Sequence, residues 1–303
     1  MKPLSAYLFR LLLTLMITSP LYAAERIAVA GGSITEILYR LGEQDKIIAV
    51  DSTSTYQAAD KKHPLLGYVR NISVEGLLSL NPDLLIGEND TGPSKALEQV
   101  RAVGLKTVII EEDGSIPAIK KKIREVGKLV QAQDKAEQLI QEIQLDIDAL
   151  EYANNKQQEI SDVKPKVLFL LTLQNGSPIA AGNHTSAHTT ITAAGGDNAL
   201  KNEKGWVKLS PEAALDLNPD VIVVMNRPDA PLDAVAKLAH FKYTNAVKNN
   251  AVYSIDGGYL LGFGPRTPQA IVELGTMIHD SFPLPPGYQF RYDNQQSNTG
   301  HGS

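Results

Sequence analysis

Short runs of continuous apolar residues alternate along the chain with stretches in which apolar residues recur every three or four positions. Continuous runs of this length are typical of strands buried on both faces, as in parallel sheets covered by helices. The chain is predicted to form strands over residues 26–30, 47–51, 83–87, 106–112, 166–171, 220–225 and 251–256. Because helical patterns separate these runs in both halves of the chain, the sequence predicts an α/β fold that is built twice.

A long polar stretch with a helical apolar stripe lies between the two groups of strands. The stripe includes Leu139, Ile143 and Leu150, and no glycine or proline occurs between Asp134 and Asn155. A helix of that length spans about 30 Å, roughly the width of a domain, and would resist large hinge motion between two lobes. The predicted organisation is an N-terminal lobe at 25–115, a connecting helical segment at 116–160 and a C-terminal lobe at 161–285.

The two ends of the chain differ from its middle. "MKPLSAYLFR", "LLLTLMIT" and "SPLYAA" supply a positive start, an apolar run and a break followed by small residues, which predicts a signal peptide over residues 1–24. A retained membrane anchor is the alternative, and the break at Ser19-Pro20 disfavours it. Residues 286–303 offer little to bury and are predicted to be disordered.

Composition narrows the class of protein. The chain has 303 residues, 43% hydrophobic and 21% charged, which is typical of a globular protein. A net charge of −5 disfavours nucleic acid as a partner, and the basic run "KKKIR" is interpreted as a solvated helix face. The chain has no cysteine, hence no disulfide and no cysteine to carry a lipid, so we expect an exported, unlipidated protein of the periplasm.

The sequence contains no recognisable catalytic motif, and we expect no enzyme. "AGGSITE" (30–36) lacks the spacing of a phosphate-binding loop and is interpreted as a helix start, with Ser33 as the cap and Glu36 as its capping-box partner. There is no G-x-S-x-G elbow and no cysteine nucleophile. His184 and His188 stand four residues apart and form a secondary candidate for metal binding, without a third clustered ligand.

One corner of the chain occurs twice at an offset of 137 residues. "SVEGLLSLNPD", starting at Ser73, matches "SPEAALDLNPD", starting at Ser210. Each serine is predicted to cap a short helix that ends before Asn-Pro, where the next strand begins. Glu75 and Glu212 then fall in the first helical turn, where the helix dipole favours a carboxylate.

"GGSITEILYRLG" (31–42), "LLGYVRNISVEGLLSLNPD" (65–83) and "LLGFGPRTPQAIVEL" (260–274) together resemble the periplasmic haem-binding proteins of bacterial ABC haem importers. The resemblance covers residues 26–282 and implies two Rossmann-like lobes, joined by a single long helix, with a ligand cleft between them. It implies haem as the transported ligand and a dimeric ABC permease with its ATPase subunits as the partner, with an outer-membrane haem receptor system as a further candidate.

The same resemblance assigns the site residues. In the family the tyrosine of "GYxR" ligates the haem iron, which implies this role for Tyr68. A phenolate suits ferric iron, but a free phenol loses its proton only near pH 10, so cations must help. Arg70 and Arg227 are the candidates, and Gly67 would let a flat ligand approach the backbone.

Some family members add a histidine from the second lobe and hold two stacked haems. The corresponding stretch here, "LFLLTLQNGSP", has none, so we expect one five-coordinate haem. Glutamates on the two lobes of related proteins meet arginines of the permease, which makes Glu75 and Glu212 candidates for docking. A cobalamin or ferric-siderophore carrier of the same fold is the alternative, followed by an α/β enzyme with a site in the cleft.

Overall fold

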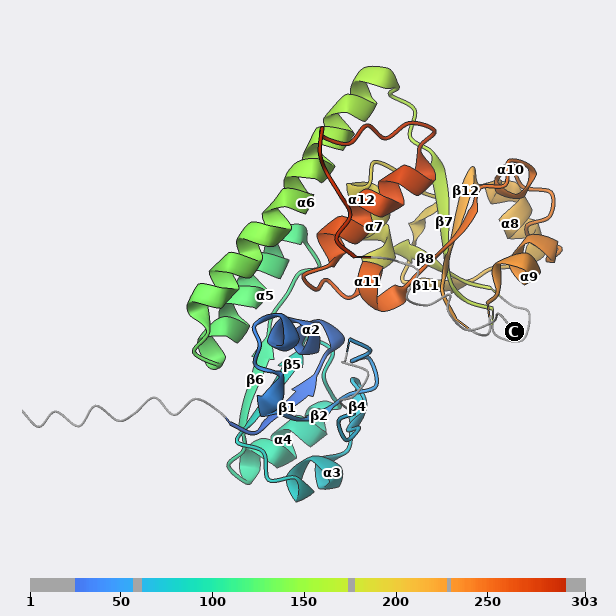
Figure 1. Cartoon of the computed structure of the whole chain (residues 1–303). Coiled ribbons are helices and arrows are strands. Elements are labelled where there is room, and N and C mark those ends of the chain that lie inside the picture. Colours follow the sequence, from blue (N-terminus) through green and yellow to red (C-terminus); the bar gives the residue numbers. More distant parts are fainter. Residues whose placement is uncertain (1–24, 57–61, 174–177, 228–229, 293–303) are drawn as a thin grey trace, which may run out of the picture.

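The structure is a computed structural model that describes residues 25–56, 62–173, 178–227 and 230–292. Two α/β lobes lie one above the other along the long helix α6 (Gln133–Ile160), as Figure 1 shows. The predicted signal peptide lies outside the described residues. Within them, no helix combines the length and the apolar character that crossing a membrane requires.

The N-terminal lobe contains a parallel four-stranded sheet in the order β2-β1-β5-β6. Every residue of β1 is buried, as expected for a central strand that helices cover on both faces. The elements of this lobe are β1 (Ile27–Ala30), α2 (Gly32–Arg40), η2 (Gln44–Lys46), β2 (Ile47–Val50), β3 (Gly67–Tyr68), β4 (Asn71–Ile72), α3 (Val74–Ser79), β5 (Leu84–Glu88), α4 (Ser94–Ala102) and β6 (Lys106–Ile110).

The C-terminal lobe has a mixed sheet with the main order β10-β8-β7-β12-β13. Strands β7, β12 and β13 are parallel, whereas β8 runs antiparallel to β7. Its elements are β7 (Lys166–Thr172), β8 (Ile179–Asn183), α7 (Ser186–Ala193), β9 (Asp197–Asn198), β10 (Leu200–Lys204), β11 (Trp206–Lys208), α8 (Pro211–Leu217), β12 (Val221–Met225), α9 (Leu232–Lys237), α10 (Asn245–Lys248), β13 (Val252–Ile255), α11 (Gly257–Leu261) and α12 (Thr267–Ile278).

All seven predicted strands are present, and the α/β fold class is confirmed. The sequence did not indicate β8, because "IAAGN" is short and poor in β-branched residues. It also did not indicate that β8 makes the second sheet mixed, since strand direction depends on pairing between distant segments.

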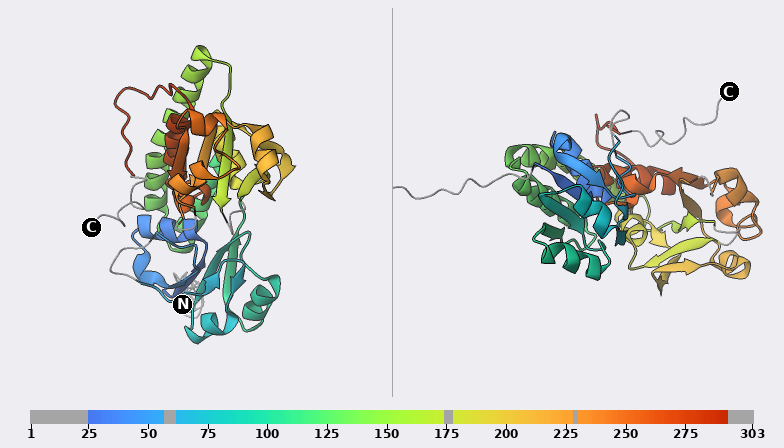
Figure 2. Two further views of the ribbon diagram at one scale, coloured as in Figure 1. Left: turned by 90° about the vertical axis from the view of Figure 1, so that its right-hand side faces the viewer. Right: turned by 90° about the horizontal axis from the view of Figure 1, so that it is seen from below.

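Helix α6 joins the two hydrophobic cores. Its N-terminal half packs beside α5 (Ile116–Leu129) and contributes Leu139 and Ile143 to the core of the N-terminal lobe. Its C-terminal half packs beside α12 and contributes Leu150 and Ala153 to the core of the C-terminal lobe. With 28 residues, α6 is about 42 Å long, and the views in Figure 2 show it flanking both lobes. The predicted connecting segment contains two helices, α5 and α6, because the chain turns at Gln131, where φ is 60°.

The repeated corner has the same local structure in both lobes. Ser73 Oγ accepts a hydrogen bond from the backbone N–H of Gly76 at 3.1 Å, and Ser210 Oγ accepts one from Ala213 at 3.2 Å. The predicted serine caps are therefore confirmed. The left-handed conformation of Asn81 and Asn218, with φ of 47° and 39°, then ends each short helix.

The aspartate of each corner anchors the first strand of its lobe. Asp83 Oδ2 accepts from the backbone N–H of Arg26 at 3.0 Å, and Asp220 Oδ2 accepts from that of Lys166 at 2.9 Å. The side chain of Arg26 donates to Leu80 O, and that of Lys166 donates to Leu217 O. Both carbonyl oxygens lie at the end of the corner helix of the same lobe. These contacts explain the repeated serine, asparagine and aspartate, but they do not involve Glu75.

Residues 286–292 contradict the predicted disorder of the tail. The Tyr288 hydroxyl donates to Asp146 Oδ1 at 2.9 Å, and Arg291 forms an ion pair with the same buried carboxylate on α6. Gln269 on α12 accepts from the backbone N–H of Arg291 at 2.6 Å. Tyr292 reaches Arg40 on α2, so this segment bonds to both lobes and to α6. Residues 293–303 lie outside the described part of the chain.

We predict that Arg291→Ala lowers the free energy of unfolding by about 1–3 kcal/mol, because it leaves the Asp146 carboxylate buried without its cation. Denaturant unfolding followed by circular dichroism would measure the change. Arg124→Ala is the matched control, since Arg124 and its partner Glu137 are both half-exposed and their pair should matter little. Equal stability of the Arg291 variant and the wild type would show that the segment is not held as described.

Candidate functional site

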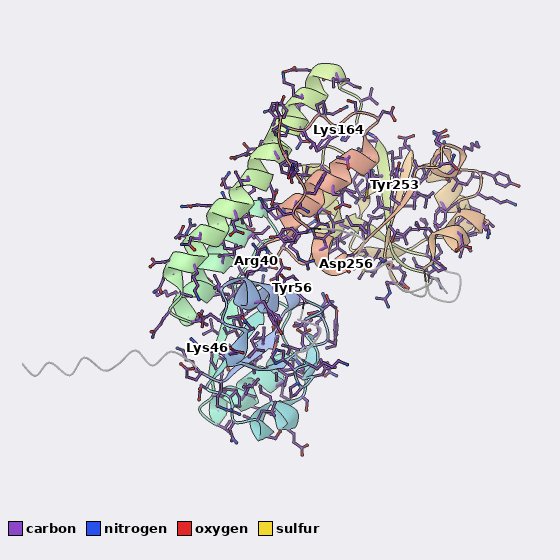
Figure 3. The ribbon with its side chains drawn as sticks, viewed as in Figure 1. Arg40, Lys46, Tyr56, Lys164, Tyr253 and Asp256 are labelled. Carbon is purple, nitrogen blue, oxygen red and sulfur yellow. The ribbon has the colours of Figure 1, made fainter. Side chains whose placement is uncertain are left out.

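A cavity of about 820 Å³ lies between the two lobes. The segments that follow β1, β2 and β5, including the start of α2, form its wall on the N-terminal lobe, and the segments that follow β12 and β13, including α11, form its wall on the C-terminal lobe. These are the carboxyl ends of parallel strands, the edge at which open α/β sheets bind ligands. The volume falls within the range of sites for small molecules and cofactors. Figure 3 labels Tyr56 and Asp256, which line the cavity from the two lobes.

Tyr68 lies in the wall of this cavity, on a tight hairpin made of β3 and β4. Tyr68 is 49% exposed. Neighbouring loops hold the hairpin, because Gly67 O accepts from Ser52 N at 2.8 Å and Val69 O accepts from Gly92 N at 2.9 Å. The tyrosine ring is thus presented to the cavity from a fixed backbone.

Gly67 has a conformational reason to be glycine. Its φ is +99°, a value that residues with a side chain rarely adopt, and an added Cβ would lie 2.8 Å from Asn71 O across the hairpin. The residue therefore shapes the turn that carries Tyr68. The prediction that it lets a flat ligand approach the backbone stays a prediction.

The two candidate arginines differ in their placement. Arg227 follows β12 and lines the cavity from the C-terminal lobe, so the structure brings Arg227 and Tyr68 into the wall of one cavity. Arg70 is not among the lining residues. Its Nε lies 3.1 Å from Oδ2 of Asp90, which itself lines the cavity at the rim.

The two candidate histidines lie away from the cavity lining. His184 is exposed, and His188 on α7 is half-buried with Nδ1 3.3 Å from Nδ2 of Asn198. Within the described ranges, no group of three or more histidine, aspartate or glutamate side chains is arranged to hold a metal ion. His188 thus contacts β9 of the second sheet and is not among the lining residues of the cavity.

The predicted capping box at the start of α2 is wrong. The helix begins after Gly31 without a side-chain cap, and Ser33 instead donates to Glu88 at the end of β5. Glu36 points across the lobe boundary, where Oε1 accepts from the backbone N–H of Arg266 at 3.0 Å and Oε2 lies 3.1 Å from Arg266 Nε. Burial raises the pKa of Glu36, and the guanidinium of Arg266 opposes that rise.

Lys122 is an exception to the interpretation of "KKKIR" as a solvated face, which holds for the exposed Lys121 and Arg124. Its side chain is fully buried behind the cavity wall, where Nζ donates to Ser33 Oγ at 2.7 Å and pairs with Glu88 and Glu112. Burial raises the pKa of Glu88, and the charge of Lys122 lowers it in opposition. The helical spacing partly indicated that Lys122 is buried, because Lys122 lies on the same face of α5 as the buried Ile119 and Ile123.

The segment "GFGPR" forms the contact between the lobes beneath the cavity. Phe263, from the C-terminal lobe, packs into the core of the N-terminal lobe and has a positive φ of 47°. The Arg266 guanidinium lies over the rings of Tyr56 and Tyr259, at 4.8 and 5.5 Å from their centroids. The motif was recognisable in the sequence only through its resemblance to known proteins, and its partner Glu36 was not predicted.

Known proteins resemble this chain over most of its length. A sequence model described as periplasmic binding protein matches residues 27–259. The uncharacterized ABC transporter substrate-binding lipoprotein YvrC of Bacillus subtilis is 30% identical over 253 residues, covering 82% of this chain and 79% of the relative. A vitamin B12-binding protein of Yersinia pestis is 27% identical, covering 70% of this chain and 74% of its own.

Solved structures agree with the fold. The periplasmic haem-binding protein RhuT from Roseiflexus sp. RS-1 superposes with a TM-score of 0.78 at 33% identity, covering 85% of this chain and 98% of its own. The periplasmic haem-binding protein BhuT, solved with two haems, gives 0.76 at 30% identity, covering 84% and 97%. The relatives are binding proteins and not enzymes, and they share the two-lobed architecture described above. The chain therefore belongs to the periplasmic binding protein family.

Proposed function

We propose that this protein binds ferric haem in the cavity between its lobes and delivers it to an ABC importer of the inner membrane. The observation that carries the proposal is the half-exposed ring of Tyr68 in the wall of an interlobe cavity of about 820 Å³. The similarity to RhuT and BhuT, which are haem-binding proteins, supports it.

Iron chemistry gives Tyr68 its proposed role. Ferric iron favours hard, anionic oxygen ligands, and a phenolate is a known axial ligand of haem. A cation near the phenolate favours the ionised form. Arg227 lies in the wall of the same cavity, and Arg70 follows Tyr68 by two residues, so both remain candidates for this stabilisation. Gly67 sets the turn that presents the ring.

We infer that one haem is bound, with Tyr68 as its single axial ligand from the protein. No histidine lines the cavity within the described part of the chain. BhuT was solved with two haems, so a haem titration must decide the stoichiometry.

The alternative ligand is cobalamin, favoured by the similarity to the vitamin B12-binding protein. Cobalamin carries cobalt and leaves the phenol of Tyr68 without a ferric partner. Direct titration with haemin and with cyanocobalamin would separate the two ligands, because each has its own visible absorption.

The proposed location is the periplasm, without a lipid anchor. The relative YvrC is a lipoprotein, but lipoprotein anchors attach to a cysteine and this chain contains none. The predicted signal peptide at residues 1–24 would direct export.

We further propose that Glu75 and Glu212 dock the protein on a dimeric permease with its ATPase subunits. Both are exposed, and each lies in the first turn of the corner helix of its own lobe. Hydrogen bonds to its own backbone N–H and to Ser210 lower the pKa of Glu212, so it is charged at neutral pH. Two carboxylates on two lobes match a partner with two equivalent cationic subunits, as expected for charges that govern recognition and on-rate.

We predict that Tyr68→Phe weakens haem binding at least tenfold, or about 1.4 kcal/mol, because it removes the iron ligand and keeps the ring. The charge-transfer band of tyrosinate-bound ferric haem should disappear in the same spectra. Arg227→Ala and Arg70→Ala should give smaller losses. Tyr243→Phe is the matched control, since Tyr243 is also exposed but does not line the cavity. Wild-type affinity and spectrum in Tyr68→Phe would contradict the assignment.

We predict that Glu75→Ala combined with Glu212→Ala abolishes haem-stimulated ATP hydrolysis by the reconstituted importer. Haem affinity and melting temperature should stay near the wild-type values, because neither side chain lines the cavity or is buried. Glu98→Ala combined with Glu159→Ala removes the same charge from other exposed positions and should stimulate normally. Normal stimulation by the Glu75/Glu212 variant would leave these residues only a role at the helix dipole.

A further inference from the structure

Arg266 is held at the edge of the cavity by more contacts than a surface arginine makes. Glu36 Oε1 accepts a hydrogen bond from the backbone N–H of Arg266, and Glu36 Oε2 forms an ion pair with Nε at 3.1 Å without a hydrogen bond. The side chains of Arg266 and Glu36 are only 16% and 3% exposed, and Arg266 lines the cavity. A buried ion pair of this kind fixes the position and the orientation of the guanidinium.

These contacts leave part of the guanidinium unused. The guanidinium lies over the rings of Tyr56 and Tyr259, and this cation–π attraction requires no hydrogen-bond acceptor. Within the described residues, the terminal amino groups of Arg266 donate no hydrogen bond to the protein. The contact of Arg266 with Glu36 across the lobe boundary uses only Nε and the backbone N–H. The terminal amino groups are therefore available to a molecule in the cavity.

The charges around the cavity favour an anionic group at this position. The acidic lining residues Glu88 and Asp90 are each paired with a cation that does not line the cavity, Lys122 at 3.5 Å and Arg70 at 3.1 Å. At these two positions, a carboxylate that enters the cavity therefore meets negative charges that a cation offsets. The buried donor that such a carboxylate meets in the wall is the guanidinium of Arg266, whose planar shape matches the geometry of a carboxylate.

We propose that Arg266 binds a carboxylate of the ligand through its terminal amino groups, with Glu36 as the positioning residue that orients it. This inference rests on the proposed function, because haem carries two propionate carboxylates on one edge of a flat apolar ring. Arg266 then selects ligands by their carboxylates, whereas Tyr68 selects them by their metal. The ring of Tyr56, over which the guanidinium lies, limits the movement of Arg266.

The test compares haemin with haemin whose two propionates are methyl esters, which keeps the ring and the iron and removes the carboxylates. We expect the wild type to bind haemin at least tenfold more tightly than the ester. The double variant Glu36→Gln/Arg266→Gln removes both charges, so neither is left buried alone, and should reduce that preference to less than about threefold. Its affinity for the ester should equal that of the wild type, which shows that the cavity is intact.

Two further variants locate the effect. Glu36→Gln alone keeps the guanidinium and should retain a preference for haemin, and Arg124→Ala should retain it fully because Arg124 pairs with Glu137 and neither residue lines the cavity. A full preference for haemin in the double variant overturns the role of Arg266. An equal loss of affinity for both compounds in that variant also overturns it, because it indicates a structural role only. A wild type that binds neither compound contradicts the proposed function itself.

Discussion

The structure depends on helix α6 belonging to two hydrophobic cores at once. Leu139 and Ile143 pack in one lobe, and Leu150 and Ala153 pack in the other, so bending the helix would disrupt both cores. Phe263 strengthens this constraint, because it leaves its own lobe to pack in the core of the other. The distance between the lobes, and with it the width of the cavity, is therefore fixed largely by apolar packing rather than by the ligand. This favours a carrier that holds a preformed site, since a preorganised site spends little free energy on closure.

Buried charge gives the cavity its chemical character. Glu36 and Glu88 both lie in the wall, and burial raises the pKa of each. Glu36 is paired with Arg266, and Glu88 shares Lys122 with Glu112, because an unpaired buried charge is costly. The pairs offset part of the negative charge of the wall, which suits a ligand that combines an apolar ring with carboxylates. A cavity lined by unpaired carboxylates would repel such a ligand.

The sequence predicted the local parts of this arrangement well. The seven strands are continuous apolar runs, and the serine caps at Ser73 and Ser210 follow from the preference of a short helix for a side-chain acceptor. It failed where a side chain finds its partner far along the chain. Glu36 was read against Ser33, three residues away, although its partner Arg266 is distant in sequence. Residues 286–292 were predicted to be disordered, but the Tyr288 side chain bonds to Asp146 on α6 and the Arg291 backbone bonds to Gln269 on α12. The roles of Tyr68, Arg70, Arg227, Glu75 and Glu212 remain predictions, because they concern a ligand and a partner.

The central claim is that one tyrosine of the N-terminal lobe holds the metal of a ligand that lies between the lobes. A crystal structure of the wild-type protein after addition of haemin tests it most directly. The account predicts the haem ring inside the cavity, the Tyr68 oxygen bonded to the iron and no second axial ligand from the protein. An iron bonded to another side chain, or a haem bound outside the cavity between the lobes, would contradict it.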